Sequence, residues 1–460
     1  MFAVSRILAF IACLVTLESA TVAEKTPWRV GSALELPTWL TLEAESRIRI
    51  AHLTDQFRSG SDGNPTALSF RTRLSARIST NAFRAGLELL DSRVYANSDT
   101  PLNTTHGNPV DVLQAYMGVQ TNNFISYGDE LNLRAGRLTM DVGSRRLVAR
   151  NRYRNTINSF TGVDVEWTSP KKHTARFFAV VPVRRRPDDP AAIESNQFKF
   201  DKENINAFLA GLFYSVPDFL EEGFDVEAFL VSLTETDGDQ PSRNRRIYTP
   251  GFRLMKKPKA GHVDGQLEAM LQVGTSRASA LDNDTDDLDH LAYFAHAEVG
   301  YTFSAPWQPR LAFQYDFASG DRNPNDGKSN RFDTLFGARR FDFGPTGIYG
   351  AFARTNINTP GLRVRLAPTS AIDGFVAHRL FWLAAKRDTW TTSGLQDPTG
   401  ESGRFIGQQI EGRARFQIVP GNVRLETGAA YFIPGSFAKN AATSPTETAL
   451  LFYTQLVLTI

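Results

Sequence analysis

Strict alternation of apolar and charged residues is the feature that most constrains what this chain can fold into. Residues 40–50 read LTLEAESRIRI and residues 68–80 read LSFRTRLSARIST, with apolar side chains mainly at even positions and charged or polar ones at odd positions. Successive side chains of a strand point to opposite faces of the sheet. Each segment therefore has one apolar face and one strongly charged face, as a wall between lipid and water requires.

The same alternation recurs along the chain and divides it into eighteen strand-like segments. Connections after even-numbered segments are mostly short, such as 170–173, whereas those after odd-numbered segments are long and polar, such as 138–160 and 319–360. This pattern predicts an all-β fold, an antiparallel up-and-down transmembrane β-barrel of about 18 strands with long extracellular loops and short periplasmic turns. A soluble sandwich or solenoid is disfavoured because no repeat of fixed period is visible. The segments are 40–50, 68–80, 82–92, 111–120, 131–137, 161–169, 174–183, 206–216, 224–234, 248–256, 263–276, 292–303, 309–318, 361–368, 374–386, 405–418, 423–432 and 449–460.

The N-terminus predicts export. Residues 1–23 have a positive residue, an apolar stretch and a small-residue end, which is typical of a signal peptide. Residues 24–38 are then a periplasmic N-terminal segment, 39–460 the barrel, and the outer membrane of a Gram-negative bacterium the location. The only cysteine, Cys13, lies within the signal, and its poor lipobox disfavours a lipoprotein. A mature chain without cysteine has no disulfides and no thiolate metal sites.

Arginines on the charged faces carry the functional hypothesis. If the apolar residues face lipid, these arginines face the lumen, because the reverse would cost about 2–4 kcal/mol for each arginine near the membrane midplane. Carboxylates share the same faces, so one interpretation is a wall of ion-pair ladders. The other is an arginine surplus, notable along 69–79, that attracts anions and binds carboxylates in a bidentate fashion.

The most basic stretch precedes one of the predicted strands. Six arginines lie within the eighteen residues 137–154, and an alternating strand with Asp164 and Glu166 follows. If this loop folds back into the lumen, which the sequence leaves open, it forms a constriction together with the neighbouring walls. The candidate pore-lining residues are Arg47, Arg49, Arg71, Arg73, Arg134, Arg137, Arg145, Arg146, Arg152, Arg154, Asp164, Glu166, Arg363, Arg365, Glu411, Arg413 and Arg415.

Several motifs together resemble the alginate export family of outer-membrane proteins. They are the stretch 136–167, the run 315–336 with FASGDRNP, the sequence AAYFIPGSF at 429–437, QAY at 114–116 and the charged strand 409–417. The resemblance implies an eighteen-stranded barrel with an electropositive constriction that passes a polyuronate from the periplasm outward. By position, it also implies that the pore residues include Arg71 or Arg73, Arg134, Arg152 and the Arg413/Arg415 pair, together with acidic Asp164 and Glu166.

One departure from the family bears on partners. The alginate exporter has a long periplasmic loop near its C-terminus, whereas the equivalent connection here is only 419–422. Gating from the periplasm and a periplasmic secretion partner therefore stay open. So does the solute, which is a short uronate oligomer or another anion taken up from outside.

The remaining motifs give no firm chemistry. Acidic loops with Asp282, Asp284 and Asp286, and with Asp321 and Asp326, offer alternating oxygens for a structural Ca²⁺ but lack the EF-hand glycine and glutamate. No nucleophile motif is present, so an enzyme is not predicted. The net charge of +2 gives no reason to expect nucleic acid as a partner. The predicted function is diffusion of an acidic polysaccharide or oligosaccharide through an arginine-lined pore, without cofactors. The alternatives are a general or substrate-specific uptake porin for small anions and a purely structural barrel.

Overall fold

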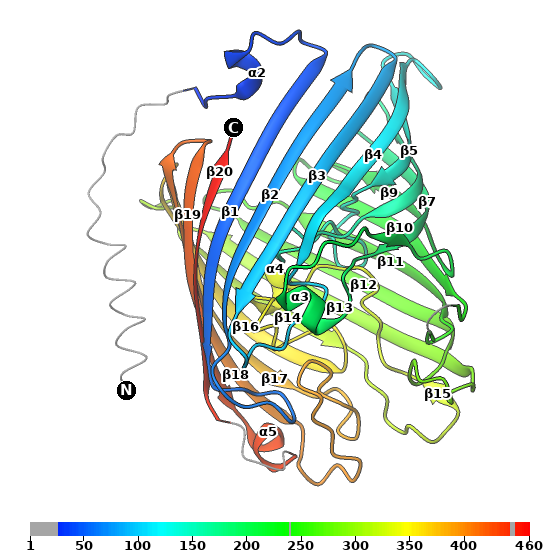
Figure 1. The fold of residues 1–460 in the computed structure, drawn as a ribbon, viewed down its shortest axis with the longest axis vertical. Helices are drawn as coiled ribbons and strands as arrows, with labels where there is room; N and C mark the ends of the chain where they lie inside the picture. Colours follow the sequence, from blue (N-terminus) through cyan, green and yellow to red (C-terminus); the bar gives the residue numbers. More distant parts are fainter. Residues whose placement is uncertain (1–25, 239–240, 442–446) are drawn as a thin grey trace.

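The computed structural model describes residues 26–238, 241–441 and 447–460, and the predicted signal peptide lies outside these ranges. Eighteen antiparallel strands close into one barrel, which confirms the predicted fold class (Figure 1). Two further short strands, β8 (Lys202–Glu203) and β15 (Lys328–Ser329), lie in loops. Among the described residues, no helix is long and apolar enough to cross a membrane.

The barrel strands follow the predicted segments closely. β17 is shorter at its end than predicted and stops at Trp382 rather than at residue 386, because its register with β18 shifts after Phe381 and the chain leaves the sheet. The strands are β1 (Leu40–Thr54), β2 (Thr66–Ser79), β3 (Phe83–Ala96), β4 (Asn108–Asn122), β5 (Glu130–Leu138), β6 (Phe160–Thr168), β7 (Thr174–Arg184), β9 (Ala207–Val216), β10 (Phe224–Glu235), β11 (Arg246–Lys256), β12 (Val263–Ser276), β13 (Leu288–Thr302), β14 (Arg310–Ala318), β16 (Ile357–Thr369), β17 (Ile372–Trp382), β18 (Phe405–Val419), β19 (Val423–Pro434) and β20 (Ala449–Thr459).

The barrel closes where its first strand meets its last. β1 pairs antiparallel with β20, with Ile48 opposite Leu456. Ile48 is 45% exposed on the outer wall, whereas its neighbour Arg47 is 2% exposed on the inner side. The alternation in the sequence thus places apolar side chains toward lipid and arginines toward the lumen, as the energetics of the bilayer require.

Both described chain ends lie at the end of the barrel that carries the short turns, which is the periplasmic end (Figure 1). Part of the predicted N-terminal segment, including α2 (Val30–Ala33), packs there. The Trp28 backbone N–H donates to Asn422 Oδ1 at 2.8 Å, and Asn422 Nδ2 donates to the Trp28 carbonyl at 2.8 Å. The short turn between β18 and β19 therefore holds the segment that precedes the first strand.

The lumen has one side that is apolar rather than charged. Leu209 of β9, Val231 of β10, Met270 of β12 and Phe294 of β13 are all buried on the inner face and belong to one hydrophobic cluster. In water such a wall would be unfavourable, at about 25 cal/mol per Å² of exposed apolar surface. Protein must therefore cover it.

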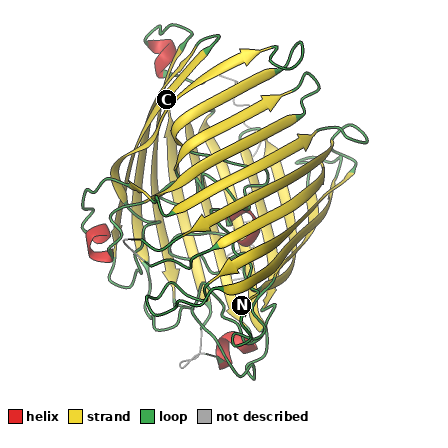
Figure 2. Ribbon diagram, turned by 90° about the vertical axis from the view of Figure 1, so that its right-hand side faces the viewer, coloured by secondary structure: helices red, strands yellow, loops and turns green. Residues whose placement is uncertain are grey.

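Two long loops provide that cover by folding into the barrel. One is 139–159, between β5 and β6, and the other is 319–356, between β14 and β16, which contains α4 (Arg340–Phe343). Met140 and Val148 of the first loop and Phe332 and Phe343 of the second join the same hydrophobic cluster as the wall. Both views show α4 inside the barrel (Figures 1 and 2). We call these two loops together the plug. Two other helices, α3 (Pro190–Glu194) and α5 (Ser436–Asn440), lie in loops at the extracellular end.

Candidate pore constriction

A buried arginine joins the two halves of the plug to each other and to the wall. Arg146 forms ion pairs with Glu268 of β12 and with Asp342 of α4, the latter at 2.9 Å. Arg354 donates to Asp342 at 2.6 Å and to the Arg146 carbonyl at 3.0 Å. A short parallel bridge between Val148 and Phe336 adds backbone pairing. Arg146 was a candidate for the pore lining, but in the structure it is buried and connects the plug to the wall.

Two more candidate arginines hold the plug from the opposite wall. Arg47 donates to the carbonyls of Tyr153 and Arg154, both at 3.0 Å, and Arg71 donates to the Arg152 and Arg154 carbonyls at 2.8 and 2.9 Å. Both side chains are almost fully buried. They fix the path of loop 139–159 through the lumen instead of facing the solute. The loop therefore folds inward, which the sequence left open.

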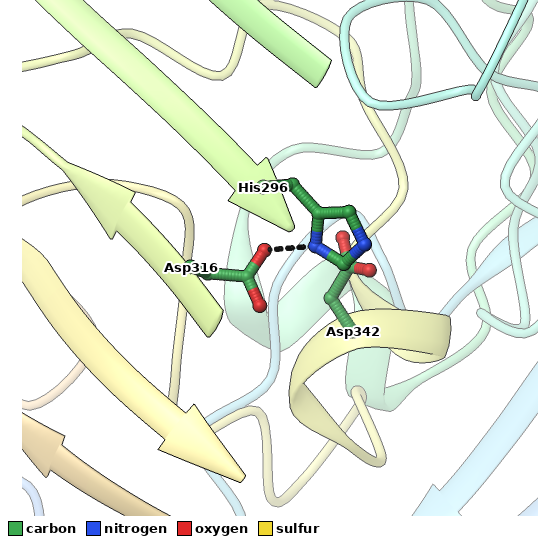
Figure 3. A group of neighbouring side chains, drawn as sticks. All are labelled: His296, Asp316 and Asp342. Atoms are coloured by element: carbon green, nitrogen blue, oxygen red, sulfur yellow. Dashed lines mark hydrogen bonds and ion pairs between the residues drawn. The ribbon is translucent and has the colours of Figure 1, made fainter. Parts of the chain in front are cut away.

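A histidine and two carboxylates beside α4 resemble a metal site in their spacing. His296 Nδ1 lies 2.7 Å from Asp316 Oδ1, and one donor atom each of His296, Asp316 and Asp342 lies within 4.8 Å of the others (Figure 3). However, Asp342 is already paired with Arg146 and Arg354, and Asp316 with Arg379 at 2.5 Å. Three guanidinium groups in contact with these two carboxylates repel a cation from the same place. The group is a buried ion-pair network that fastens α4 to β13 and β14.

The space left between the plug and the wall formed by β13, β14 and β16–β18 is a cavity of about 510 Å³, which we call the arginine chamber. Its basic lining comprises Arg145, Arg152, Arg310, Arg340, Arg363, Arg365, Arg413 and Arg415. Six of these were sequence candidates. Acidic lining residues are fewer, namely Asp141 and Glu298, and Tyr153, Phe341 and Phe375 add aromatic surface.

Half of the chamber arginines are neutralised by carboxylates. Arg310 pairs with Asp264 and Glu298, Arg340 with Glu411, Arg413 with Asp373 at 2.9 Å, and Arg415 with Glu426 at 2.6 Å. Glu411, itself a candidate, is thus buried against Arg340.

The other four chamber arginines carry the surplus of positive charge. Within the described residues, Arg145, Arg152, Arg363 and Arg365 form no ion pair with a carboxylate. Arg145 lies over the Phe341 ring at 5.0 Å, and Arg363 lies over Phe375 at 4.9 Å. Such stacking orients a guanidinium without neutralising it. The chamber therefore has a net positive lining that a bound anion would complement.

The arginine surplus expected along residues 69–79 is not found. Arg71 and Arg73 both pair with Glu45, Arg73 also reaches Glu88 at 2.6 Å, and Arg77 pairs with Glu43. The carboxylates come from the neighbouring strands β1 and β3, which a count along a single strand does not include. On this part of the wall the ion-pair ladder is the observed arrangement.

The remaining candidates also lie away from the chamber. Asp164 accepts from Arg134 and Arg176, and Arg137 pairs with Asp111 and Glu203. Arg49 donates to Gln455 and lies 4.1 Å from the Tyr153 ring. Arg154 lies near Arg185 and Arg339. Glu166 is half-buried opposite Arg176.

Sequence reasoning missed Arg340 and the aromatic residues Tyr153, Phe341 and Phe375. Arg340 belongs to the motif ARRFDF at 338–343, which lies in a loop assigned to the exterior. A basic pair followed by aromatic residues in a long loop was the signal available, because such a sequence is unusual for a solvated surface loop.

The acidic loops show local hydrogen bonding. Asp284 accepts from the Ser279 N–H and hydroxyl at 2.7 Å each, and Asp326 accepts from the Lys328 N–H at 3.1 Å. Asp321 accepts from the Asn323 N–H at 3.2 Å, while Asp282 and Asp286 are exposed. These contacts explain the loop conformations, and Ca²⁺ binding there stays a prediction.

Comparisons with known proteins agree with this architecture. Among solved structures, the chain is similar to the outer membrane protein OpdK from Pseudomonas aeruginosa, with 12% identity and a TM-score of 0.54 over 91% of this chain and 98% of that one. It is also similar to OccK2 (OpdF) of the same organism in complex with glucuronate, with 11% identity and a TM-score of 0.55 over 92% and 95% of the two chains. OccD3 (OpdP) gives 9% identity and a TM-score of 0.55 over 92% of each chain. Identities this low show the fold alone.

A comparison with curated proteins found no significant match. The model of the family described as alginate export matches residues 38–452. Family and fold together locate the protein in the outer membrane of a Gram-negative bacterium. Because the match spans almost the whole barrel, the chain belongs to the alginate export family.

Proposed function

We propose that this outer-membrane channel passes acidic saccharides by diffusion and that they cross the barrel through the arginine chamber. The observation that carries the proposal is the set of four chamber arginines without a carboxylate partner, Arg145, Arg152, Arg363 and Arg365. In a confined space of low dielectric, unpaired cations attract anions strongly. Arginine also binds carboxylates through two parallel hydrogen bonds, so a uronate is a better match than chloride.

The size of the chamber favours a short saccharide. Cavities of roughly 300–1,000 Å³ hold small ligands, and the arginine chamber has about 510 Å³. With the plug docked, that volume suits a uronate monomer or short oligomer. The aromatic rings of Tyr153, Phe341 and Phe375 add flat apolar surface against which a sugar ring can pack. A long polyuronate would need the plug to move.

Uptake of small anions is the second candidate. It is favoured by the three residues between β18 and β19, which leave no long periplasmic loop at the position where the family's exporter has one. The structurally similar OccK2 was solved with glucuronate, which fits a monomeric uronate here. Both candidates are passive channels, and we assign the protein no catalytic role and no cofactor.

Block of single channels by uronates of graded length tests the proposal. Purified protein in planar bilayers should show current interruptions with galacturonate or mannuronate oligomers, and their duration should grow with the first few sugar units. Neutral oligosaccharides of equal length are the control and should interrupt the current much less. Equal block by charged and neutral sugars would contradict the proposal. Block by monomers that does not deepen with length would favour the uptake porin.

A further inference from the structure

The turn between β4 and β5, residues 123–129, lies on the periplasmic rim and is held by internal hydrogen bonds (Figure 1). The Asp129 carboxylate accepts hydrogen bonds from the N–H groups of Phe124, Ile125 and Ser126 at 2.7–2.9 Å. Asn123 Oδ1 accepts from the Gly128 N–H at 2.6 Å. Asn123 and Gly128 both have positive φ, which these two residue types adopt most easily. These hydrogen bonds and backbone angles together define the conformation of the turn.

The hydrogen bonds that the Asp129 carboxylate accepts are stable to acid. Burial opposes ionisation of Asp129, but hydrogen bonds from the Trp167 indole and from the backbone of residues 124–126 lower its pKa from 3.8 to about 2. The carboxylate therefore stays charged at the pH of the periplasm.

The turn bends toward the lipid side of the barrel rather than over the pore. Trp167 Nε1 donates to Asp129 Oδ2 at 2.8 Å. In β6, Asp164 faces the lumen, where it meets Arg134 and Arg176, so Val163, Val165 and Trp167 at odd positions face outward. Asp129 is thus fastened to a side chain on the lipid-facing wall, and the turn continues that wall.

Three large apolar side chains project from the 123–129 turn. Phe124 is 60% exposed, Ile125 69% and Tyr127 91%. Leaving such side chains in water is unfavourable, whereas aromatic residues are enriched where a membrane meets water. The adjacent turn, residues 169–173, places Pro170 beside Gly128 and carries the exposed lysines Lys171 and Lys172. Lysines beside an apolar patch complement phosphate headgroups.

We propose that the 123–129 turn is a lipid anchor that inserts Phe124, Ile125 and Tyr127 among the phospholipids of the periplasmic leaflet. The occupant is phospholipid rather than protein because the turn continues the lipid-facing wall and its basic neighbours match anionic headgroups. Amphipathic segments of this kind lie roughly 5–10 Å into the boundary between headgroups and acyl chains. The turn between β9 and β10 has a similar apolar pair, Phe219 and Leu220, but also Glu221 and Glu222, which anionic lipid repels.

A single fluorescent label tests the anchor, because the only cysteine of the sequence, Cys13, lies in the predicted signal. Mature protein carrying Tyr127→Cys or Ile125→Cys is labelled with an environment-sensitive dye and refolded into phosphatidylethanolamine–phosphatidylglycerol vesicles. The matched control is Glu222→Cys in the β9–β10 turn. We expect a blue-shifted emission at positions 125 and 127, quenching by lipids brominated near the headgroup, and protection from aqueous iodide. The label at position 222 should be quenched by iodide.

If brominated lipids leave the labels at 125 and 127 unquenched while iodide reaches them as readily as it reaches position 222, the turn projects into water. The lipid anchor is then refuted, and a periplasmic protein becomes the partner to look for. Heat-modifiable migration on gels shows that each labelled variant is folded. Because both substituted side chains are exposed, folding should be unaffected.

Discussion

Replacing Arg146 by glutamine should release the plug while the barrel stays intact. Arg146, Glu268 and Asp342 are all at most 3% exposed, so the substitution removes a buried cation and leaves two buried carboxylates with fewer partners. Asp342 keeps Arg354, whereas the one hydrogen bond that Glu268 keeps within the described ranges comes from the Ser144 hydroxyl. The main effect is therefore that the buried negative charge of Glu268 loses the cation that neutralises it.

The expected cost follows from that pairing. Breaking a buried ion pair by removing one partner costs about 3–5 kcal/mol. We take about 3 kcal/mol, because Asp342 retains a partner, and this raises the population of the undocked plug by roughly two orders of magnitude. The strands lose no pairing, so the barrel itself should keep its heat-modifiable migration.

Single-channel recording is the assay. The Arg146→Gln protein should show larger conductance and frequent transitions between levels, whereas the wild type should be quieter. Adding Glu268→Gln removes the unpaired charge and should restore part of the quiet behaviour. Arg77→Gln is the matched control, because its ion pair with Glu43 is 47% and 41% exposed and contributes at most about 1 kcal/mol. Unchanged conductance and noise in Arg146→Gln would refute the role of this network in holding the plug.

Three further predictions concern the chamber and the loops. Arg365→Gln should lower the anion-to-cation permeability ratio in bi-ionic recordings, since Arg365 is an unneutralised chamber arginine, whereas Arg77→Gln should leave the ratio unchanged. Burial and the nearby Asp111 carboxylate raise the pKa of Asp201 from 3.8 to about 7. Packing of loop 185–206 against the barrel should therefore be most stable below pH 3.8, lose stability as the pH rises from 3.8 through 7, and change little above that. Proteolysis of that loop, normalised to an unfolded substrate at each pH, should show this trend, and Asp201→Asn should abolish it. Gly337→Ala should loosen the plug and raise channel noise, because a Cβ there would lie 1.8 Å from the Arg146 carbonyl oxygen, and a quiet channel would show that the loops can adjust.

The barrel could be predicted from sequence because lipid constrains every outward position. At Arg47–Ile48 and Arg71–Leu74, a charge on the wrong face would lie in hydrocarbon, so the alternation determines which face is which. The arginines of β16 and β18 that line the chamber were found in this way. The carboxylate partners of the two β18 arginines could not be predicted, since Asp373 and Glu426 lie on adjacent strands and pairing depends on register.

The plug was harder to predict, although one signal existed. Residues 207–216 form an almost continuous apolar run in which Leu209 and Phe213 face inward while Phe208 and Leu212 face lipid. Strands that are apolar on both faces are covered on both faces. That run already indicated that protein fills this side of the lumen. Which loops fill it depends on buried hydrogen bonds, such as those from Arg47 to the carbonyls of residues 152–154, and these have no signature in the sequence.

The reversal potential of the purified channel under a salt gradient tests the central claim most directly. If unneutralised arginines of the chamber select the solute, the wild-type protein should prefer anions, and the combined Arg145→Gln, Arg152→Gln and Arg365→Gln substitutions should remove most of that preference. A wild-type channel that prefers cations, or a triple variant with an unchanged reversal potential, would contradict the account.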